Sequence, residues 1–521
     1  MIKFISKHIV LIFLSLIVFL GGFLRIYNLS GSPPALNWDE AALGYNAYSV
    51  SRTFKDEYGK TLPIFTRSFD EYKSTLPMYL MIPSIKIFGL NEFGVRFPSA
   101  LIGVFSIVLI FFLAKEIFKS EKVALFAALV FSIEPWITHL TRINYESSEA
   151  MFFLLLGFWL FLISKRQNNF LPFSITSFMI SMFTYNSNKI ISPLFLIILI
   201  ILNRNEIKNY SKKIKYISLL IFMAFVIPFV ILAIAGQSFA RVSYTNIFVL
   251  WPNEYFPKIY YFVWDIVGRY LSYFSPFNLF LREPQEPATI LAGNSMFHPF
   301  EFIPFIIGLL YVLKNPKKYK ELLALILISP LPATATWNFF QPGRVMSLFA
   351  CFSILIGVGL TNISKIIPKT FQKICLVLFS LFILLNAFYV FDSINVYLPV
   401  RDGGNWQSEF KSIVPSVMKY AEKYDQVIID TSQAQPYIFY LFYGKYYPAK
   451  YLSELDLNYI GTPRKHFDFG KFHFRTINWD EDKNLRNTLF VGDQYQFSDI
   501  EILEEVKDKM GVVRAWIVGT N

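Results

Sequence analysis

Eleven apolar runs, most of them long enough to cross a lipid bilayer, constrain this 521-residue chain more than any other feature. A membrane-spanning helix needs about 20 predominantly apolar residues, and 54% of this chain is hydrophobic. We therefore predict a polytopic α-helical membrane protein with about eleven transmembrane helices. The predicted spans are residues 9–28, 95–114, 121–140, 149–164, 169–185, 188–203, 216–236, 299–313, 321–336, 345–364 and 372–391.

Lys and Arg lie mostly in the short gaps between these runs, and this pattern predicts the orientation of the chain. With a cytoplasmic N-terminus, every short basic connection falls on the inner side, as the positive-inside rule requires. The odd number of spans then places the C-terminus outside. The same pattern accounts for the net charge of +12, so we exclude nucleic acid as a partner. The first run lacks an A-x-A-like cleavage site and is expected to be an uncleaved span.

Three stretches are too long and too polar to be simple connections, and all three are predicted on the external face: residues 29–94, 237–298 and 392–521. In the first, "LPMYLMIPSIKIFGL" is too short to cross and suits a helix lying at the membrane interface. The alternative, a further true span, would invert everything downstream. We thus predict a transmembrane domain over residues 1–391 and an extracytoplasmic domain over residues 392–521.

The composition of residues 392–521 is that of a soluble α/β domain of a usual size. Hydrophobic periodicity predicts helices over residues 406–424 and 434–444. It predicts strands over residues 426–430, 472–479, 488–492 and 512–519. The chain has no Gly-rich phosphate-binding loop that would indicate a cytosolic nucleotide site.

Ionisable residues are nearly absent from the centres of the predicted spans, whereas transporters carry them there. The acids gather near the external face, and the first of them form the adjacent pair Asp39 and Glu40 in "LNWDEAALG". Asp39 has two compatible interpretations. It caps a helix that begins near this point, or it acts as a general base in a partly dry pocket.

The stretch "THLTRINYESSEAM" places Arg142 and Glu146 at the outer end of the third span and the start of the fourth. If the stretch is helical, their spacing puts them on one face. They then form a structural ion pair, or Arg142 binds a lipid-linked phosphate while an acid binds a sugar hydroxyl, an amine or a metal ion.

Further charged residues lie ahead of the interfacial helix and at the start of the tenth span. Glu71 and Lys73 in "SFDEYKSTLPMYL" form a solvated cluster with Asp70, or grip the phosphate of a membrane lipid. Arg344 in "FFQPGRVMSLFA" snorkels, or meets an anionic headgroup. His298 before a proline is weak support for a metal site.

Taken in order, these segments resemble a known class of membrane enzymes. A single first span, a loop opening with "DE", then "EYKSTLPMYL", "RFPSALIGVFSIVLIFFLAKEIF" and "LTRINYESSEAMFFLLL" resemble the protein O-mannosyltransferases and lipid A aminoarabinose transferases. These are glycosyltransferases of the GT-C class. The resemblance is clearest over residues 10–165, weaker through the later spans, and extends to the tail mainly as architecture.

The resemblance implies that a hexose or pentose passes from a polyprenyl-phosphate donor to a protein hydroxyl, lipid or glycan on the external face, with inversion. The family's catalytic acid corresponds to Asp39, with Glu40 beside it, and its arginine and following acid correspond to Arg142 and Glu146. In the aminoarabinose transferases an acid, a Lys and a Pro pair contribute to metal and lipid-phosphate binding. Here Tyr72 separates the acid from Lys73, so a divalent metal cofactor stays open.

Two other functions use the same outer charges. A transporter of lipid-linked glycans would bind a headgroup without chemistry, although the clean span centres and the large external tail argue against it. A membrane assembly protein would use the tail to bind a partner.

Overall fold

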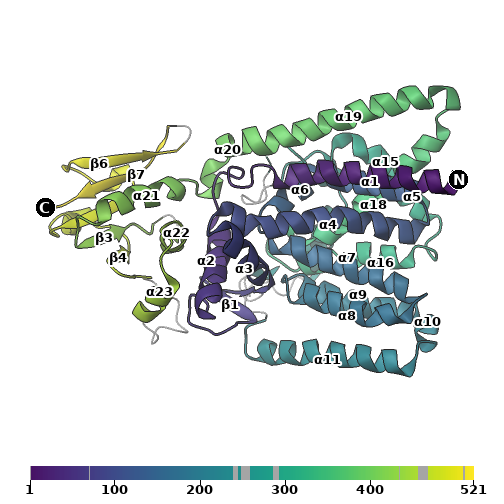
Figure 1. Ribbon diagram of the computed structural model, residues 1–521, viewed down its shortest axis with the longest axis horizontal. Coiled ribbons are helices and arrows are strands. Elements are labelled where there is room, and N and C mark those ends of the chain that lie inside the picture. The colour runs from purple at the N-terminus through teal and green to yellow at the C-terminus, as the bar shows by residue number, and fades with distance from the viewer. Residues whose placement is uncertain are drawn as a thin grey trace. The chain divides into compact units, whose positions relative to one another are not determined.

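The structure, a computed structural model, describes residues 2–69, 71–238, 245–247, 259–284, 291, 293–432, 435–455, 467–508 and 511–521 (Figure 1). The chain divides into two compact units, each built from separated segments. The helical unit comprises Met1–Tyr27 and Ser99–Ser393. The mixed unit comprises Asn28–Pro98 and Ile394–Asn521.

The helical unit consists of apolar helices joined by short connections. Its helices are α1 (Ile2–Ile26), α4 (Glu92–Phe118, which begins in the mixed unit), α5 (Glu121–Ile133), α6 (Pro135–Arg142), α7 (Glu146–Ser164), α8 (Leu171–Met182), α9 (Asn188–Leu202), α10 (Arg204–Lys208), α11 (Lys212–Ile234), α13 (Ile259–Ser272), α14 (Pro276–Phe280), α15 (Phe302–Leu313), α16 (Lys320–Ile328), α17 (Leu331–Thr334), α18 (Met346–Ile366) and α19 (Gln372–Asp392).

All eleven predicted spans coincide with helical segments, but the number of spans is not confirmed. In the described part of the chain, six helices are long and apolar enough to cross a membrane, or seven if the bent pair α5 and α6 is one span. The axes of this pair differ by 64°, so the predicted span 121–140 is broken at Pro135. The helices found at 188–203 and 299–313 are apolar but shorter than a usual span.

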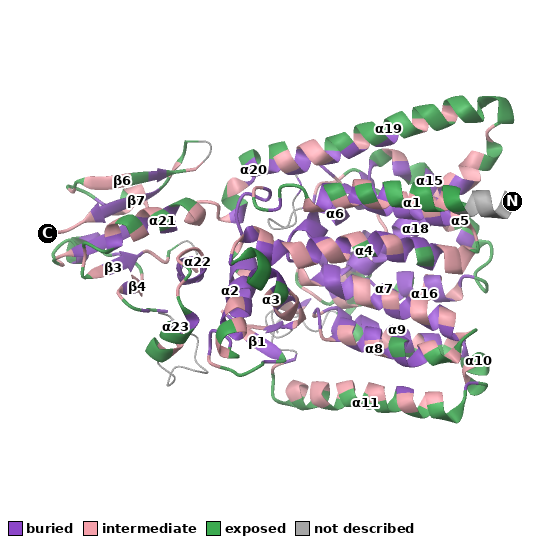
Figure 2. Ribbon diagram, viewed as in Figure 1, coloured by how far each residue is buried: buried purple, intermediate pink, exposed green. Residues whose placement is uncertain are grey.

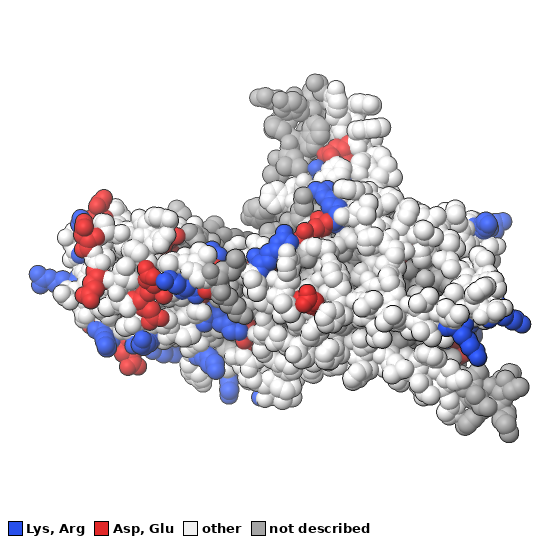
Figure 3. All heavy atoms as spheres, turned by 90° about the horizontal axis from the view of Figure 1, so that it is seen from above, with Lys and Arg blue, Asp and Glu red and all other residues white. Residues whose placement is uncertain are grey.

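Two apolar helices are buried over very little of their length, which indicates lipid as their environment. Only 6% of the apolar window in α11 and 17% of that in α19 is buried, and both helices show mostly exposed and intermediate residues in Figure 2. Exposing apolar helix surfaces of this size to water would be energetically unfavourable. In Figure 3 charged side chains gather over the sheet region at the left, while the visible face of the helical unit carries few.

Glycines bring the helices α15 and α18 into close contact. A Cβ on Gly359 of α18 would lie 1.8 Å from the backbone oxygen of Pro304, and one on Gly308 of α15 would lie 1.9 Å from the oxygen of Leu355. The backbones of the two helices therefore pack directly on each other, an arrangement typical of membrane helices with small residues at the interface.

The mixed unit combines the first loop with the end of the chain. The first loop contributes α2 (Trp38–Thr53), the hairpin β1 (Phe65–Ser68) and β2 (Glu71–Ser74), and α3 (Leu76–Phe88). The C-terminal segment contributes α20 (Leu398–Arg401), α21 (Phe410–Ala421), β3 (Gln426–Ile429), α22 (Tyr437–Tyr443), α23 (Pro448–Glu454), β4 (Phe472–Phe474), α24 (Trp479–Asp482), β5 (Thr488–Gly492), β6 (Ile502–Lys507) and β7 (Val513–Gly519).

The strands of the C-terminal segment form one mixed sheet in the order β4-β3-β5-β7-β6. The central strand β3 is parallel to both neighbours, with Val427 opposite Phe472 and Leu489. The strand β7 is antiparallel to β5 and β6. The predicted helices and strands of this segment are all found, whereas the sequence analysis missed β6 and α23.

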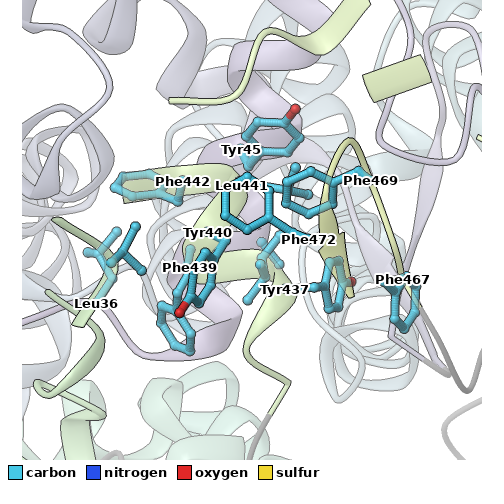
Figure 4. Close-up of a cluster of buried hydrophobic side chains, with 14 of the residues drawn as sticks. Leu36, Tyr45, Tyr437, Phe439, Tyr440, Leu441, Phe442, Phe467, Phe469 and Phe472 are labelled. Carbon is cyan, nitrogen blue, oxygen red and sulfur yellow. The ribbon is translucent and has the colours of Figure 1, made fainter. Parts of the chain in front are cut away.

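The first loop and the C-terminal segment share one hydrophobic core, rich in aromatic side chains. Tyr45 of α2 lies in this core with Tyr440 and Phe442 of α22 and with Phe469 and Phe472 (Figure 4). The Tyr45 ring meets that of Tyr451 edge-on at 6.1 Å. Residues 28–98, which the sequence analysis assigned to the transmembrane domain, thus fold together with residues 394–521.

Candidate functional site

The two acids that the sequence analysis singled out lie in the first turn of α2. Asn37 is the N-cap, and its side chain accepts a hydrogen bond from the backbone N–H of Glu40. The Glu40 carboxylate accepts in return from the N–H of Asn37 at 3.2 Å, which completes a capping box. Asn37 and Glu40 therefore cap the helix in place of Asp39. The Asp39 side chain takes no part in the capping box.

Glu40 is buried and bound to a guanidinium that the sequence analysis did not single out. Arg96, in the first turns of α4, donates from Nε and Nη2 to the two carboxylate oxygens of Glu40 at 2.9 and 3.0 Å. Its Nη1 also donates to the carbonyl oxygens of Leu29 and Pro33. Arg96 thereby connects the segment that precedes α2 to the first turn of the helix. Glu40 does not face solvent, and its contacts with Arg96 and Asn37 fix the position of this turn.

Asp39 differs from its neighbour because its side chain is 48% exposed. Its Oδ1 accepts a hydrogen bond from the ammonium of Lys73 in β2, and Lys73 is only 4% exposed. Within the described residues, no donor bonds to Oδ2 of Asp39. The structure thus presents one carboxylate oxygen on a fixed helix end, beside a buried cation.

The neighbours of this pair come from three segments of the mixed unit. The backbone N–H of Trp38 donates to Oε1 of Gln407 at 2.9 Å. The ring of Phe69 lies 6.0 Å from the Lys73 ammonium and meets the Trp38 ring edge-on. We call Asp39, Lys73, Trp38, Phe69 and Gln407 the α2 site.

Glu71 begins β2 two residues before Lys73 and is partly buried, opposite Ser68 of β1. In an extended strand, residues two apart point to the same side, so Glu71 and Lys73 share a face of the hairpin. The expected contribution of Asp70 lies outside the described residues.

A different acid of the first loop, Asp56, is structural. Its carboxylate accepts from the backbone N–H groups of Tyr58 and Lys60 and from the hydroxyl of Thr66. Burial raises the pKa of Asp56, and these hydrogen bonds oppose the shift. Asp56 therefore closes the turn that leads into the hairpin.

The residues predicted at the third and fourth spans lie in the helical unit. The stretch 138–151 is not one helix, because α6 ends at Arg142 and α7 begins at Glu146. The stretch is therefore not the single helix that the prediction assumed, and the pairing of Arg142 with Glu146 stays a prediction. Arg142 is fully buried and donates from Nη1 to the carbonyl oxygen of Leu24 at 2.7 Å, whereas Glu146 is partly exposed.

Arg344 also belongs to the helical unit and lies near the connection between α6 and α7. It ends the short turn Pro342–Arg344, and a Cβ on Gly343 would lie 2.4 Å from the hydroxyl of Tyr145, the residue before Glu146. Burial raises the pKa of Tyr273 to about 12, while the hydrogen bond with the backbone of Gln341 and the nearby Arg344 guanidinium oppose the shift. The structure thus brings Arg344 near the end of α6 and the start of α7.

The described residues do not provide a metal site: they contain no group of three or more His, Cys, Asp and Glu side chains arranged to hold an ion. His298 is buried, which lowers its pKa to about 4, and its backbone N–H donates to Glu301. The carboxylate next to His298, that of Glu301, thus accepts a backbone hydrogen bond at a helix start.

The fold of the chain is similar to those of two solved structures. It matches ArnT from Cupriavidus metallidurans, solved with undecaprenyl phosphate, with a TM-score of 0.56 and 13% identity over 97% of both chains. It matches the Archaeoglobus fulgidus oligosaccharyltransferase, solved with a tethered acceptor peptide, with a TM-score of 0.51 and 14% identity. That match covers 85% of this chain and 64% of the archaeal one. At such identities the likeness is one of fold.

Part of the sequence also matches a family model. Residues 73–232 match the family described as dolichyl-phosphate-mannose-protein mannosyltransferase, and over these residues the predicted resemblance is confirmed. A putative mannosyltransferase of Bacillus subtilis, YkcB, is 27% identical over 209 residues, which are 38% of this chain. An uncharacterised protein of Aquifex aeolicus is 31% identical over 129 residues, 23% of this chain.

The chain matches about a quarter of the length of these curated relatives, 27% and 26% respectively. The fold, the exposed apolar helices and the family match over residues 73–232 together indicate an integral, multi-pass membrane protein.

Proposed function

We propose that the protein is a glycosyltransferase that moves a sugar from a polyprenyl-phosphate donor to an acceptor at the external face of the membrane, with inversion at the anomeric carbon. The observation that carries this proposal is the α2 site, where the half-exposed Asp39 is held beside the buried Lys73. The mannosyltransferase family match and the GT-C fold support the reaction class.

In the proposed reaction an acceptor hydroxyl or amine attacks the anomeric carbon from the side opposite the phosphate. The bond between that carbon and the phosphate oxygen breaks, and the bonding electrons leave with the phosphate. Asp39 accepts the acceptor's proton through Oδ2, since Lys73 occupies Oδ1. The phosphate is already a good leaving group, so the protein needs to supply a base, positioning and cationic stabilisation.

The other residues have proposed supporting parts. Glu40 fixes the start of α2 through the capping box and Arg96. Lys73 orients Asp39 and steadies the departing phosphate, with Glu71 beside it on the hairpin. Arg142, Glu146 and Arg344 are proposed to bind substrate on the helical unit.

The test is sugar transfer by the purified protein from a panel of polyprenyl-phosphate sugars. Removing the base should lower turnover by about 10²- to 10⁴-fold. We expect this loss for Asp39→Asn, because Asn keeps the shape of the half-exposed side chain but cannot accept the proton. Circular dichroism of the purified variant checks that it folds normally. Near-normal turnover in a normally folded variant would reject Asp39 as the base.

The same assay separates the enzyme from a transporter. A protein that only moves lipid-linked glycans would leave every donor intact while carrying a labelled lipid across a vesicle bilayer. That result would replace the proposed function.

A further inference from the structure

A cleft lies at the other end of α2 from Asp39. It has a volume of about 320 Å³ and is lined by the last turns of α2 and α3: Tyr48, Ser51, Arg52, Ile85, Lys86, Gly89 and Leu90. Two of these residues are cations, and none is an acid. Within the described residues neither Arg52 nor Lys86 forms an ion pair with a carboxylate. The cleft therefore offers uncompensated positive charge to a ligand.

Helix C-termini attract cations, so a purely local explanation needs consideration. Three of the carbonyls at these two helix ends already have partners. The oxygen of Val50 accepts from the N–H of Phe54, and that of Ile85 accepts from the N–H of Gly89. The oxygen of Phe88 accepts from the side chain of Asn91 at 2.7 Å. Arg52 and Lys86 are thus not needed to satisfy these three carbonyls, and both side chains are exposed.

An apolar surface adjoins these cations. Ile87 is 73% exposed and Phe88 is 42% exposed. The ring of Phe88 packs against those of Phe93 and Phe97, with centroids 4.8 and 5.3 Å away. Cations beside exposed aliphatic and aromatic side chains are typical of a surface that contacts lipid headgroups and the upper parts of their chains.

We propose that this cleft binds the phosphate of an anionic phospholipid of the surrounding membrane. Arg52 and Lys86 donate hydrogen bonds to the phosphate oxygens, Tyr48 borders the headgroup beside Arg52, and the acyl chains lie over Ile87 and Phe88.

The length of α2 argues for a structural phospholipid instead of the sugar donor. Asp39 lies in the first turn of the helix and Arg52 in the last. Thirteen residues at about 1.5 Å per residue separate them by roughly 20 Å. One phosphate cannot lie in the cleft and also beside Asp39.

The proposal is tested by titrating the purified full-length protein in detergent with short-chain phosphatidylglycerol and, separately, with short-chain phosphatidylcholine. We expect binding of phosphatidylglycerol, detected as a rise in melting temperature and as protection of residues 48–54 and 85–91 from hydrogen exchange. Each basic residue near a membrane surface strengthens the binding of an anionic lipid, so Arg52→Gln with Lys86→Gln should weaken binding roughly 30-fold.

Lys55→Gln is the matched control, because Lys55 is an exposed cation just beyond α2 that does not line the cleft. It should bind phosphatidylglycerol like the wild type. Equal affinity of the double variant and the wild type, or equal binding of phosphatidylcholine, would overturn the proposal. So would displacement of phosphatidylglycerol from the cleft by a polyprenyl monophosphate that binds more tightly, because the site would then belong to the donor lipid.

Discussion

Asp39 and Glu40 are adjacent carboxylates with very different surroundings. Glu40 is 1% exposed and pairs with the fully buried Arg96, whereas Asp39 is half-exposed and contacts Lys73. Successive positions on a helix differ by about 100°, so one acid of the pair points into the unit and the other toward its surface. The division between a positioning acid and a proposed base follows from this geometry.

The buried pair predicts a large effect of one mild substitution. Glu40→Gln keeps a side chain that can complete the capping box, but it leaves the Arg96 charge buried without a counterion. Breaking such a pair costs about 3–5 kcal/mol, so we expect a clearly lower melting temperature for the purified protein.

The control for this prediction is Glu422→Gln, which removes an exposed carboxylate of the same unit. It should leave the melting temperature nearly unchanged. An equally stable Glu40→Gln protein would contradict the importance of the pair.

Part of the α2 site could be predicted from sequence. The pair "DE" after an apolar run indicated Asp39, and "NWDE" has the N-x-x-E spacing of a capping box, a signal that the sequence analysis did not use. Arg96 could not be found in this way, because its partner is 56 residues away in the chain. Gln407 is even more distant from Trp38, 369 residues along the chain.

Among the elements, the break between α5 and α6 shows how a predicted span can be interrupted while its backbone carbonyls keep hydrogen-bond partners. Helix ends leave their last carbonyls without partners, and Pro135 cannot supply an N–H. Arg25 of α1 replaces the missing donors, with bonds of 2.8 and 3.0 Å to the oxygens of Ser132 and Phe131. Hydropathy detected the apolar run but carries no information about such a distant partner.

Close packing of α15 on α18 makes a second prediction at this scale. In Gly359→Ala the new methyl group would collide with backbone, not with a movable side chain. Overpacking of this kind costs about 1–3 kcal/mol. We expect a lower melting temperature and a lower yield of folded protein in detergent.

Gly22→Ala in α1 is the matched control, since the nearest atom to its Cβ would lie at an ordinary 3.6 Å. This variant should behave like the wild type. If Gly359→Ala melts no lower than Gly22→Ala, the two backbones do not pack as closely as described.

For the whole molecule, the distribution of basic residues predicts which ends of the helices face the cytoplasm. In a background with Cys351→Ala and Cys375→Ala, we expect a membrane-impermeant maleimide to label Arg486→Cys in intact cells. Lys213→Cys, in a predicted inner connection, should react only after permeabilisation. The opposite labelling pattern would reverse the predicted orientation.

The mixed unit also imposes an order of events during synthesis. Its two segments are separated by roughly 300 residues, which a ribosome takes about 15–60 s to add at 5–20 residues per second. Over that interval the helix that carries Asp39 exists without α22 and the sheet beneath it. The enzyme we propose therefore assembles its reactive centre only when the last part of the chain has been delivered, so an interrupted chain would bear every apolar helix and no activity.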